Sequence, residues 1–112
     1  MNILGVRVDN FNTQEILKKL SYFLDSNLSH KIFTPNPEML VDAQKDHYFK
    51  EVLNSGDLNV CDGFGLSLVS GAKRLPGVDL MMSICQIAES KNKSIYLLGS
   101  GSQEVIEGSK NF

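Results

Sequence analysis

Short apolar runs alternate with longer amphipathic stretches along this chain, and the alternation limits the folds that it can adopt. The apolar runs are short enough to be buried strands, and turn-forming residues lie close to most of them. In the amphipathic stretches, apolar residues recur three and four positions apart, which is the period of a helix with one buried face. Strands that alternate with helices predict an α/β fold with a mainly parallel sheet flanked by helices.

The expected elements follow one another without internal repeats. We expect strands at residues 3–8, 31–34, 58–61 and 94–98. The last of these runs is the strongest strand signal in the chain. Asn12 and Asn36 are expected to cap two helices, because an Asn side chain accepts hydrogen bonds from free backbone N–H groups. The second of these helices begins with Pro37 and is expected to break near Asp46, and a later helix is expected to begin at Asp79.

The composition is that of an ordinary soluble protein. The chain has 112 residues, which suits one domain over residues 1–112. Its net charge of -2 argues against nucleic-acid binding, which normally needs a basic patch. No stretch approaches the roughly 20 apolar residues that cross a bilayer, and the amino terminus has no signal-peptide pattern. We therefore expect a cytoplasmic protein.

The cysteines and histidines do not form a metal-binding pattern. Cys61 and Cys85 lie in apolar surroundings and are expected to be reduced and buried. His30 and His47 are far apart, and no Cys or His neighbour stands at the spacing of a zinc site. We expect no metal site and no cofactor.

Three loops follow expected strands, at residues 34–38, 62–65 and 99–101. Because the carboxyl ends of parallel strands meet at one edge of a sheet, where ligands bind in open α/β folds, we expect these loops to lie close together. Asp62 stands between a strand and a helix, beside glycines that let a ligand approach closely. An equally good interpretation is that Asp62 caps the next helix. The loops supply hydroxyl, amide and carboxylate groups, which suit a sugar or a nucleotide.

Gly99 and Gly101 resemble half of a dinucleotide-binding fingerprint, since they follow a strand and precede a helix. The third glycine is absent, because Glu104 stands in its place, and no acidic residue follows about 20 positions later. A nucleotide-binding oxidoreductase domain is therefore a disfavoured alternative. The turn still fits a phosphate at a helix N-terminus, and it equally fits a turn without a ligand.

Five motifs occur in one order and span essentially the whole chain. They are ILGVRVD at residues 3–9, TPNPE at 34–38, DGFG at 62–65, GVDLM at 77–81 and YLLG at 96–99. In this order they resemble the bacterial WecG/TagA/CpsF glycosyltransferase family. The resemblance implies a Rossmann-like α/β fold and an inverting hexosyltransferase without an obvious metal motif.

The resemblance also implies the substrates. The donor would be a UDP-sugar carrying N-acetylmannosamine or a relative, and the acceptor a saccharide on undecaprenyl diphosphate. The products feed teichoic acid or other cell-surface polysaccharides. Since this acceptor is a lipid, the resemblance allows a peripheral contact with the inner face of the membrane.

Single residues correspond to positions of the family. Asp62 matches the proposed base, which takes a proton from the acceptor hydroxyl as that oxygen attacks the anomeric carbon. Thr34 and Asn36 match residues that orient the sugar by hydrogen bonds. The loop that holds Arg74, a further match, is shorter than in the family. The substrate-binding residues expected in all are Thr34, Asn36, Arg74, Gly63 and Gly99.

Family members are roughly twice as long, so the resemblance covers about their N-terminal half. Two interpretations follow. The chain is either a transferase of this family or a truncated, non-catalytic module that folds and binds a nucleotide sugar or self-associates. An unpaired sheet edge left by truncation would invite association, so we expect a homo-oligomer.

Overall fold

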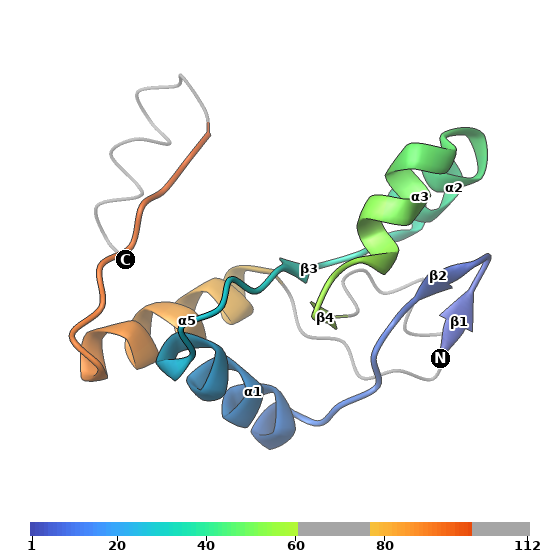
Figure 1. Ribbon diagram of the computed structural model, residues 1–112. Coiled ribbons are helices and arrows are strands. Elements are labelled where there is room, and N and C mark those ends of the chain that lie inside the picture. Colours follow the sequence, from blue (N-terminus) through green and yellow to red (C-terminus); the bar gives the residue numbers. More distant parts are fainter. Residues whose placement is uncertain (61–76, 100–112) are drawn as a thin grey trace.

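The computed structural model describes residues 1–60 and 77–99, which form a mixed α/β structure (Figure 1). In chain order its elements are β1 (Asn2–Ile3), β2 (Val6–Arg7), α1 (Thr13–Asp25), β3 (Ile32–Phe33), α2 (Pro37–Lys45), α3 (His47–Asn54), β4 (Leu58–Asn59) and α5 (Gly77–Ser90). Strands and helices thus alternate as the sequence predicts, although the strands are short. No described helix is both long enough and apolar enough to cross a membrane.

The first strand signal is a hairpin rather than one strand. The prediction of a single strand at residues 3–8 was wrong, because β1 and β2 pair antiparallel with Ile3 opposite Val6. The turn between them holds Leu4 and Gly5 at positive φ, 52° and 84°, as a tight type I′ turn requires. The Asn2 side chain accepts a hydrogen bond from the Gly5 N–H at 2.9 Å and so supports the turn. Sequence alternation cannot separate the two cases, because the apolar pattern continues through the turn.

The parallel pairing is centred on β4. β3 pairs parallel with β4, with Ile32 opposite Leu58. On the other side of β4, Asp9 forms a parallel bridge with Val60, and the Asp9 N–H donates to the Asn59 carbonyl at 2.9 Å. The described strands thus form two small sheets, an antiparallel one in the hairpin and a parallel one of β3 and β4, which agrees with a mixed α/β class.

Two hydrophobic clusters lie on opposite faces of β3 and β4. The cluster under α2 and α3 buries Val6, Val8, Leu40, Ala43 and Leu53. The cluster under α1 and α5 buries Ile16, Leu20, Leu58, Val60 and Leu80. Successive side chains of a strand point to opposite faces, so Ile32 packs against the second cluster and Phe33 against the first. Helices accordingly flank the strands on both sides, as expected.

The helix starts agree with the predicted caps. The Asn12 side-chain oxygen accepts a hydrogen bond from the Glu15 N–H, and that of Asn36 accepts one from the Met39 N–H, both at 2.9 Å. Asp46 ends α2 and caps α3, which confirms the predicted break. Each cap satisfies one of the backbone donors that a helix start leaves without a partner.

Residues 94–98 do not form the predicted strand. α5 ends in a Schellman-type turn, in which Asn92 has a positive φ of 59° and the Lys93 N–H donates to the Ala88 carbonyl at 2.8 Å. The chain then leaves as an extended arm, orange in Figure 1, that runs away from β3 and β4. The prediction was wrong because a strand needs a neighbouring strand, and the arm has none among the described residues.

Candidate functional site

The carboxyl ends of three neighbouring segments meet at one edge, which we call the carboxyl edge. It is formed by Asp9, by Thr34 after β3 and by Val60 after β4. The Val60 N–H donates to the Phe33 carbonyl at 2.9 Å, and Asp9 bridges to Val60 from the other side. Ligands bind at this kind of edge in open α/β sheets. The structure therefore places Thr34 beside the end of the strand that leads to Asp62.

The loop between β3 and α2 has a rigid backbone. Thr34 is half-buried and Pro35 is buried, while Pro37 occupies the first turn of α2. Proline fixes its own φ and keeps the preceding residue extended, so both Thr34 and Asn36 are held out of helical angles. The Asn36 side-chain oxygen is engaged as the helix cap, which leaves its amide NH2 group as the part suited to a ligand. The loop thus carries a hydroxyl group and an amide group on a rigid backbone.

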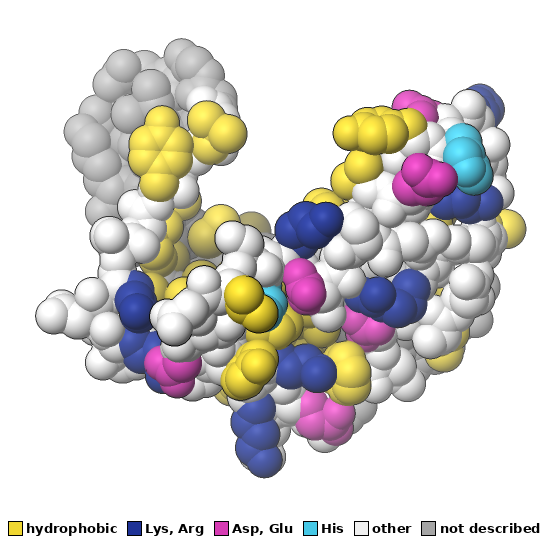
Figure 2. Space-filling view, in the orientation of Figure 1, with side chains coloured by type: hydrophobic (Ala, Val, Ile, Leu, Met, Phe, Trp, Pro, Cys, Tyr) yellow, Lys and Arg dark blue, Asp and Glu magenta, His cyan; other side chains and the backbone are white. Residues whose placement is uncertain are grey.

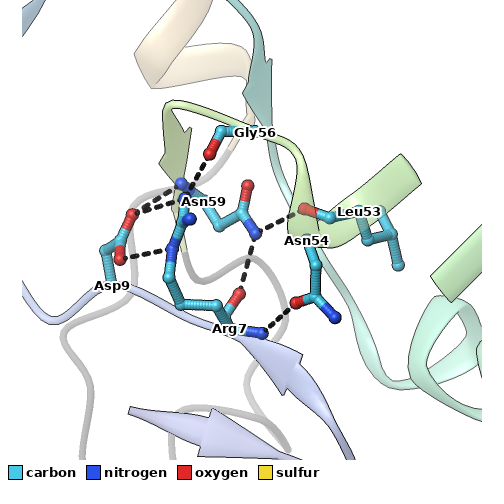
Figure 3. Close-up of polar contacts among 6 residues, drawn as sticks. All are labelled: Arg7, Asp9, Leu53, Asn54, Gly56 and Asn59. Atoms are coloured by element: carbon cyan, nitrogen blue, oxygen red, sulfur yellow. Dashed lines mark hydrogen bonds and ion pairs between the residues drawn. The ribbon is translucent and has the colours of Figure 1, made fainter. Parts of the chain in front are cut away.

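Asn59 lies at the centre of a buried polar network (Figure 3). Its side-chain nitrogen donates to the carbonyls of Arg7 and Leu53, each at 2.8 Å. Its side-chain oxygen is buried and has no hydrogen-bond partner among the described residues, and it fills the space that a Cβ on Gly56 would need. An apolar side chain at this position would remove the Asn59 donor from the Arg7 carbonyl and leave the buried Leu53 carbonyl with the longer hydrogen bond from the Gly56 N–H, at 3.3 Å. This explains why a polar residue stands in a central strand.

Arg7 and Asp9 hold the same strand from its edge. The Arg7 Nε lies 3.0 Å from the Asp9 carboxylate, and a second guanidinium nitrogen donates to the Gly56 carbonyl. The other Asp9 oxygen accepts the Asn59 backbone N–H at 2.9 Å. Both oxygens of this half-buried carboxylate are therefore occupied within the protein. Asp9 works as a clamp on β4 rather than as a free acid or base.

The clamp also reaches α3 and the hairpin. The Asn54 side-chain oxygen accepts the Arg7 N–H, and its nitrogen donates to the Gly5 carbonyl, both at 2.8 Å. Arg7, Asp9, Asn54 and Asn59 thus tie the hairpin, the end of α3 and β4 together (Figure 3). The polar network therefore fixes the position of β4, and with it the point at which the chain reaches the carboxyl edge.

The residues predicted for the site fall into three groups. Asp62, Gly63 and Arg74 lie outside the described residues. Thr34 lies at the carboxyl edge directly after β3, and Asn36 follows it as the cap of α2; their contact with a sugar stays a prediction. Gly99 is exposed, and the arm that it ends points away from β3 and β4 in Figure 1. The described structure does not bring Gly99 to the carboxyl edge.

The structure describes only some of the residues for which we expected reduced, buried cysteines and no metal site. Cys85 is free and half-buried on α5, so it is more accessible than predicted, while Cys61 lies outside the described residues. Within residues 1–60 and 77–99, no three His, Cys, Asp or Glu side chains are close enough to hold a metal ion.

A shallow cavity of about 320 Å³ lies over the first turns of α2, lined by Pro37, Glu38, Val41 and Asp42.

The sequence analysis did not predict the polar network around Asn59. Arg7 and Asp9 are two positions apart, so their side chains share one side of an extended segment, and their charges are opposite. That spacing is a usable signal for an ion pair at a strand end. The contact with Asn59, about 50 residues away, depends on the parallel pairing and has no local signature.

Comparison with known proteins gives a consistent result over nearly the whole chain. The sequence model described as "Glycosyl transferase WecG/TagA/CpsF family" matches residues 1–111. An N-acetylglucosaminyldiphosphoundecaprenol N-acetyl-beta-D-mannosaminyltransferase of Staphylococcus aureus strain NCTC 8325 is 29% identical over 118 residues, covering 98% of this chain and 46% of that protein. The protein of the same name from strain MRSA252 is 29% identical over 108 residues, covering 89% of this chain and 42% of its own length. The chain spans about half the length of these curated relatives.

Proposed function

This chain belongs to the WecG/TagA/CpsF glycosyltransferase family, and from that premise we propose that its carboxyl edge is the core of a glycosyl-transfer site. The observation that carries the proposal is the family match over residues 1–111, which includes every loop that we assign to the site. The proposed fold of the complete site is Rossmann-like, with Asp62 in the loop that follows β4.

We assign the substrates by analogy with the relatives. The names of the S. aureus proteins describe transfer of N-acetyl-beta-D-mannosamine to N-acetylglucosaminyldiphosphoundecaprenol. For this chain we propose N-acetylmannosamine or a related sugar, a UDP-sugar as donor and a saccharide on undecaprenyl diphosphate as acceptor. Such a reaction serves teichoic acid or other cell-surface polysaccharide synthesis. It takes place in the cytoplasm, with a peripheral contact at the membrane that holds the acceptor lipid.

The proposed reaction is an inverting displacement at the anomeric carbon. The acceptor hydroxyl oxygen forms the new bond, its proton passes to the Asp62 carboxylate, and UDP leaves with the electron pair of the broken bond. The step involves no oxidation or reduction, so it needs no redox cofactor. The position of Asp62 in the sequence supports this role. Asp62 follows Val60 by two residues, and Val60, directly after β4, is bridged by Asp9 at the carboxyl edge.

Thr34 and Asn36 are proposed to orient the sugar. Both come from the rigid loop after β3, so little conformational entropy is lost when a ligand orders their side chains. The Thr34 hydroxyl and the Asn36 amide nitrogen match the hydroxyl and N-acetyl groups of a sugar. We propose Gly63 as a point of close backbone approach and Arg74 as a partner for the diphosphate.

A second candidate function follows from the length of the chain. The match covers 46% of the S. aureus relative of strain NCTC 8325. The alternative is a family module that folds and binds a nucleotide sugar without transferring it. Turnover separates the two candidates, because both predict donor binding.

The test is thermal unfolding with and without UDP-N-acetylmannosamine, followed by a transfer assay with a lipid-linked N-acetylglucosamine acceptor. A ligand at about ten times its Kd that binds only the folded chain should raise Tm by about 5–10 °C. Asp62→Asn should keep this shift and abolish transfer. Absence of a shift at millimolar donor contradicts donor binding, and transfer that survives Asp62→Asn contradicts the role of the base.

A further inference from the structure

Side chains replace part of the backbone pairing where residues 6–9 lie beside β4. In the described part of the chain, the only backbone hydrogen bond between these two segments runs from the Asp9 N–H to the Asn59 carbonyl, at 2.9 Å. In a regular parallel pair, the Asn59 N–H would donate to the Arg7 carbonyl. Here it donates to the Asp9 carboxylate at 2.9 Å, and the Arg7 carbonyl accepts from the Asn59 side chain at 2.8 Å (Figure 3).

This substitution concentrates the contact at the carboxyl edge. The Arg7 N–H is also turned away from β4, since it donates to the Asn54 side chain at the end of α3, at 2.8 Å. Within the described residues, backbone pairing with this side of β4 therefore involves Asp9 alone. Val60 lies between Asp9 on one side and Phe33 on the other, whose carbonyl accepts the Val60 N–H at 2.9 Å. Asp9 is thus the residue through which the first segment holds the end of β4.

The Asp9 carboxylate lies at the edge where we propose that a diphosphate binds. On the face drawn in Figure 2, Lys and Arg side chains are interspersed with Asp and Glu side chains and form no continuous basic patch. A carboxylate without a cationic partner at this edge would repel a diphosphate. The Arg7 Nε, 3.0 Å from the Asp9 carboxylate, offsets that charge. The ion pair therefore allows a carboxylate to replace a backbone acceptor without leaving net negative charge at the edge.

We propose that Asp9 is a positioning residue for glycosyl transfer. Its carboxylate holds Val60 beside the strand that ends at Thr34, and so sets the point from which the chain continues toward Asp62. This inference rests on the proposed function, and in it Asp9 contacts no substrate and accepts no proton. A small displacement of a reacting group is enough to slow a reaction strongly, because the attacking oxygen and its base must be aligned.

A purely structural role for Asp9 predicts a different result. Loss of the carboxylate would then lower only the fraction of folded chain, and the measured rate would fall in the same proportion. Asn54 provides a matched comparison in the same polar network. Its side chain also makes two hydrogen bonds to distant segments, with the Arg7 N–H and the Gly5 carbonyl, both at 2.8 Å. Neither bond involves β4, so Asn54→Ala separates general stability from the position of the carboxyl edge.

The test compares transfer from UDP-N-acetylmannosamine to a lipid-linked N-acetylglucosamine acceptor, with rates normalised to the folded fraction measured by circular dichroism. Asp9→Ala should lower kcat at least about tenfold and change the KM for the donor by less than about threefold. Asp9→Asn keeps an oxygen that accepts the Asn59 N–H and should recover most of kcat. Asn54→Ala should keep the kcat of the parent. Equal losses of kcat in Asp9→Ala and Asn54→Ala overturn the proposal.

Amide hydrogen exchange at Val60 provides a readout that does not need turnover. Asp9→Ala should speed exchange of the Val60 N–H at least about tenfold relative to Asn54→Ala, because the end of β4 opens more readily. Unchanged exchange in Asp9→Ala shows that the carboxylate does not hold β4 and overturns the proposal. A parent chain without transfer contradicts the proposed transferase function, and the positioning role fails with it. Transfer by the parent with an unchanged kcat in Asp9→Ala overturns the positioning role alone.

Discussion

Residues 58–60 and residues 94–98 are both short apolar runs after a helix, yet the described structure gives them opposite environments. Leu58, Asn59 and Val60 are almost completely buried and have parallel neighbours on both sides. In the arm, Tyr96 and Leu98 are almost completely exposed. The run that contains an asparagine is the centre of the sheet, and the more hydrophobic run lies outside it.

The difference teaches that neighbours, more than hydrophobicity, decide which run becomes an interior strand. β4 receives backbone hydrogen bonds from two sides and side-chain hydrogen bonds through Asn59. The arm leaves α5 through the turn at Asn92 and meets no strand among the described residues. Backbone groups that enter the interior must be paired, so an apolar run without a neighbour stays outside however hydrophobic it is.

The largest predicted effect comes from removing the same side chain in the two runs. Leu58→Ala should lower the free energy of unfolding by about 3 kcal/mol, because it leaves a cavity against α1 and α5. Leu98→Ala should change it by less than about 0.5 kcal/mol at a protein concentration low enough to keep the chain monomeric. Urea unfolding of both variants measures the contrast. Equal losses would show that the arm is buried in the folded chain.

Asn59→Ala should cost about 1–3 kcal/mol, because it removes the side-chain donor from the carbonyls of Arg7 and Leu53, of which the Leu53 carbonyl keeps the longer hydrogen bond from the Gly56 N–H. Asn27→Ala is the control, since Asn27 is exposed and should be nearly neutral. The free energies come from urea unfolding at neutral pH. Similar values for the two variants would show that the buried network adds nothing to stability.

Gly56→Ala should cost about 1–3 kcal/mol, because a Cβ would collide with the Asn59 side-chain oxygen and lie 2.7 Å from the Phe33 ring. Its cost should be smaller in the background of Asn59→Ala, where one of the two colliding groups is gone. A double-mutant cycle measures this coupling. Purely additive costs would contradict the contact between Gly56 and Asn59.

Asn36→Ala should cost about 1 kcal/mol, because it removes the cap of α2. Asn36→Ser keeps a capping oxygen and should restore most of the stability. The serine lacks the amide nitrogen, so under the proposed function it should still weaken donor binding in the thermal-shift assay. If donor binding recovers together with stability, the proposed contact between Asn36 and the sugar is wrong.

The smallest predicted effect is at Asp57, at the amino-terminal end of β4. The pKa of its carboxyl lies below the ordinary value, chiefly because the Lys31 backbone N–H donates to it at 2.7 Å, and the charges of His30 and Lys31 act in the same direction. A lowered pKa in the folded state stabilises the protein above the pKa of the unfolded chain. The stabilisation is lost as the pH falls through the folded pKa.

Asp57→Asn should therefore reduce the loss of unfolding free energy as the pH falls into the acid range. The slope of unfolding free energy against pH should stay unchanged above about pH 6. Urea unfolding between about pH 2 and pH 7 measures the slope. Asp42→Asn, on the exposed side of α2, is the matched control and should leave the acid side as steep as in the parent. An acid limb that is equally steep in Asp57→Asn would contradict the proposed linkage.

Local sequence determined the starts of α1, α2 and α3, whereas α5 begins at Gly77 and not at Asp79 as predicted. The caps at Asn12 and Asn36, the break at Asp46 and the buried faces of α1 and α5 follow from contacts within a few residues, so the pattern predicts them. The family could also be predicted from the sequence, because it depends on the order of motifs along the chain. For the site, the sequence predicted that Thr34 and Asn36 would lie at the carboxyl edge.

Tertiary structure alone decided the remaining features. The hairpin at Leu4 and Gly5, the clamp that joins Arg7 and Asp9 to Asn59, and the exclusion of residues 94–98 from the described sheet depend on which distant segments meet. A strand is defined by hydrogen bonds to another segment, whereas a helix satisfies its own backbone. An apolar run therefore indicates that its side chains favour burial. Only the complete fold determines whether another strand lies beside it.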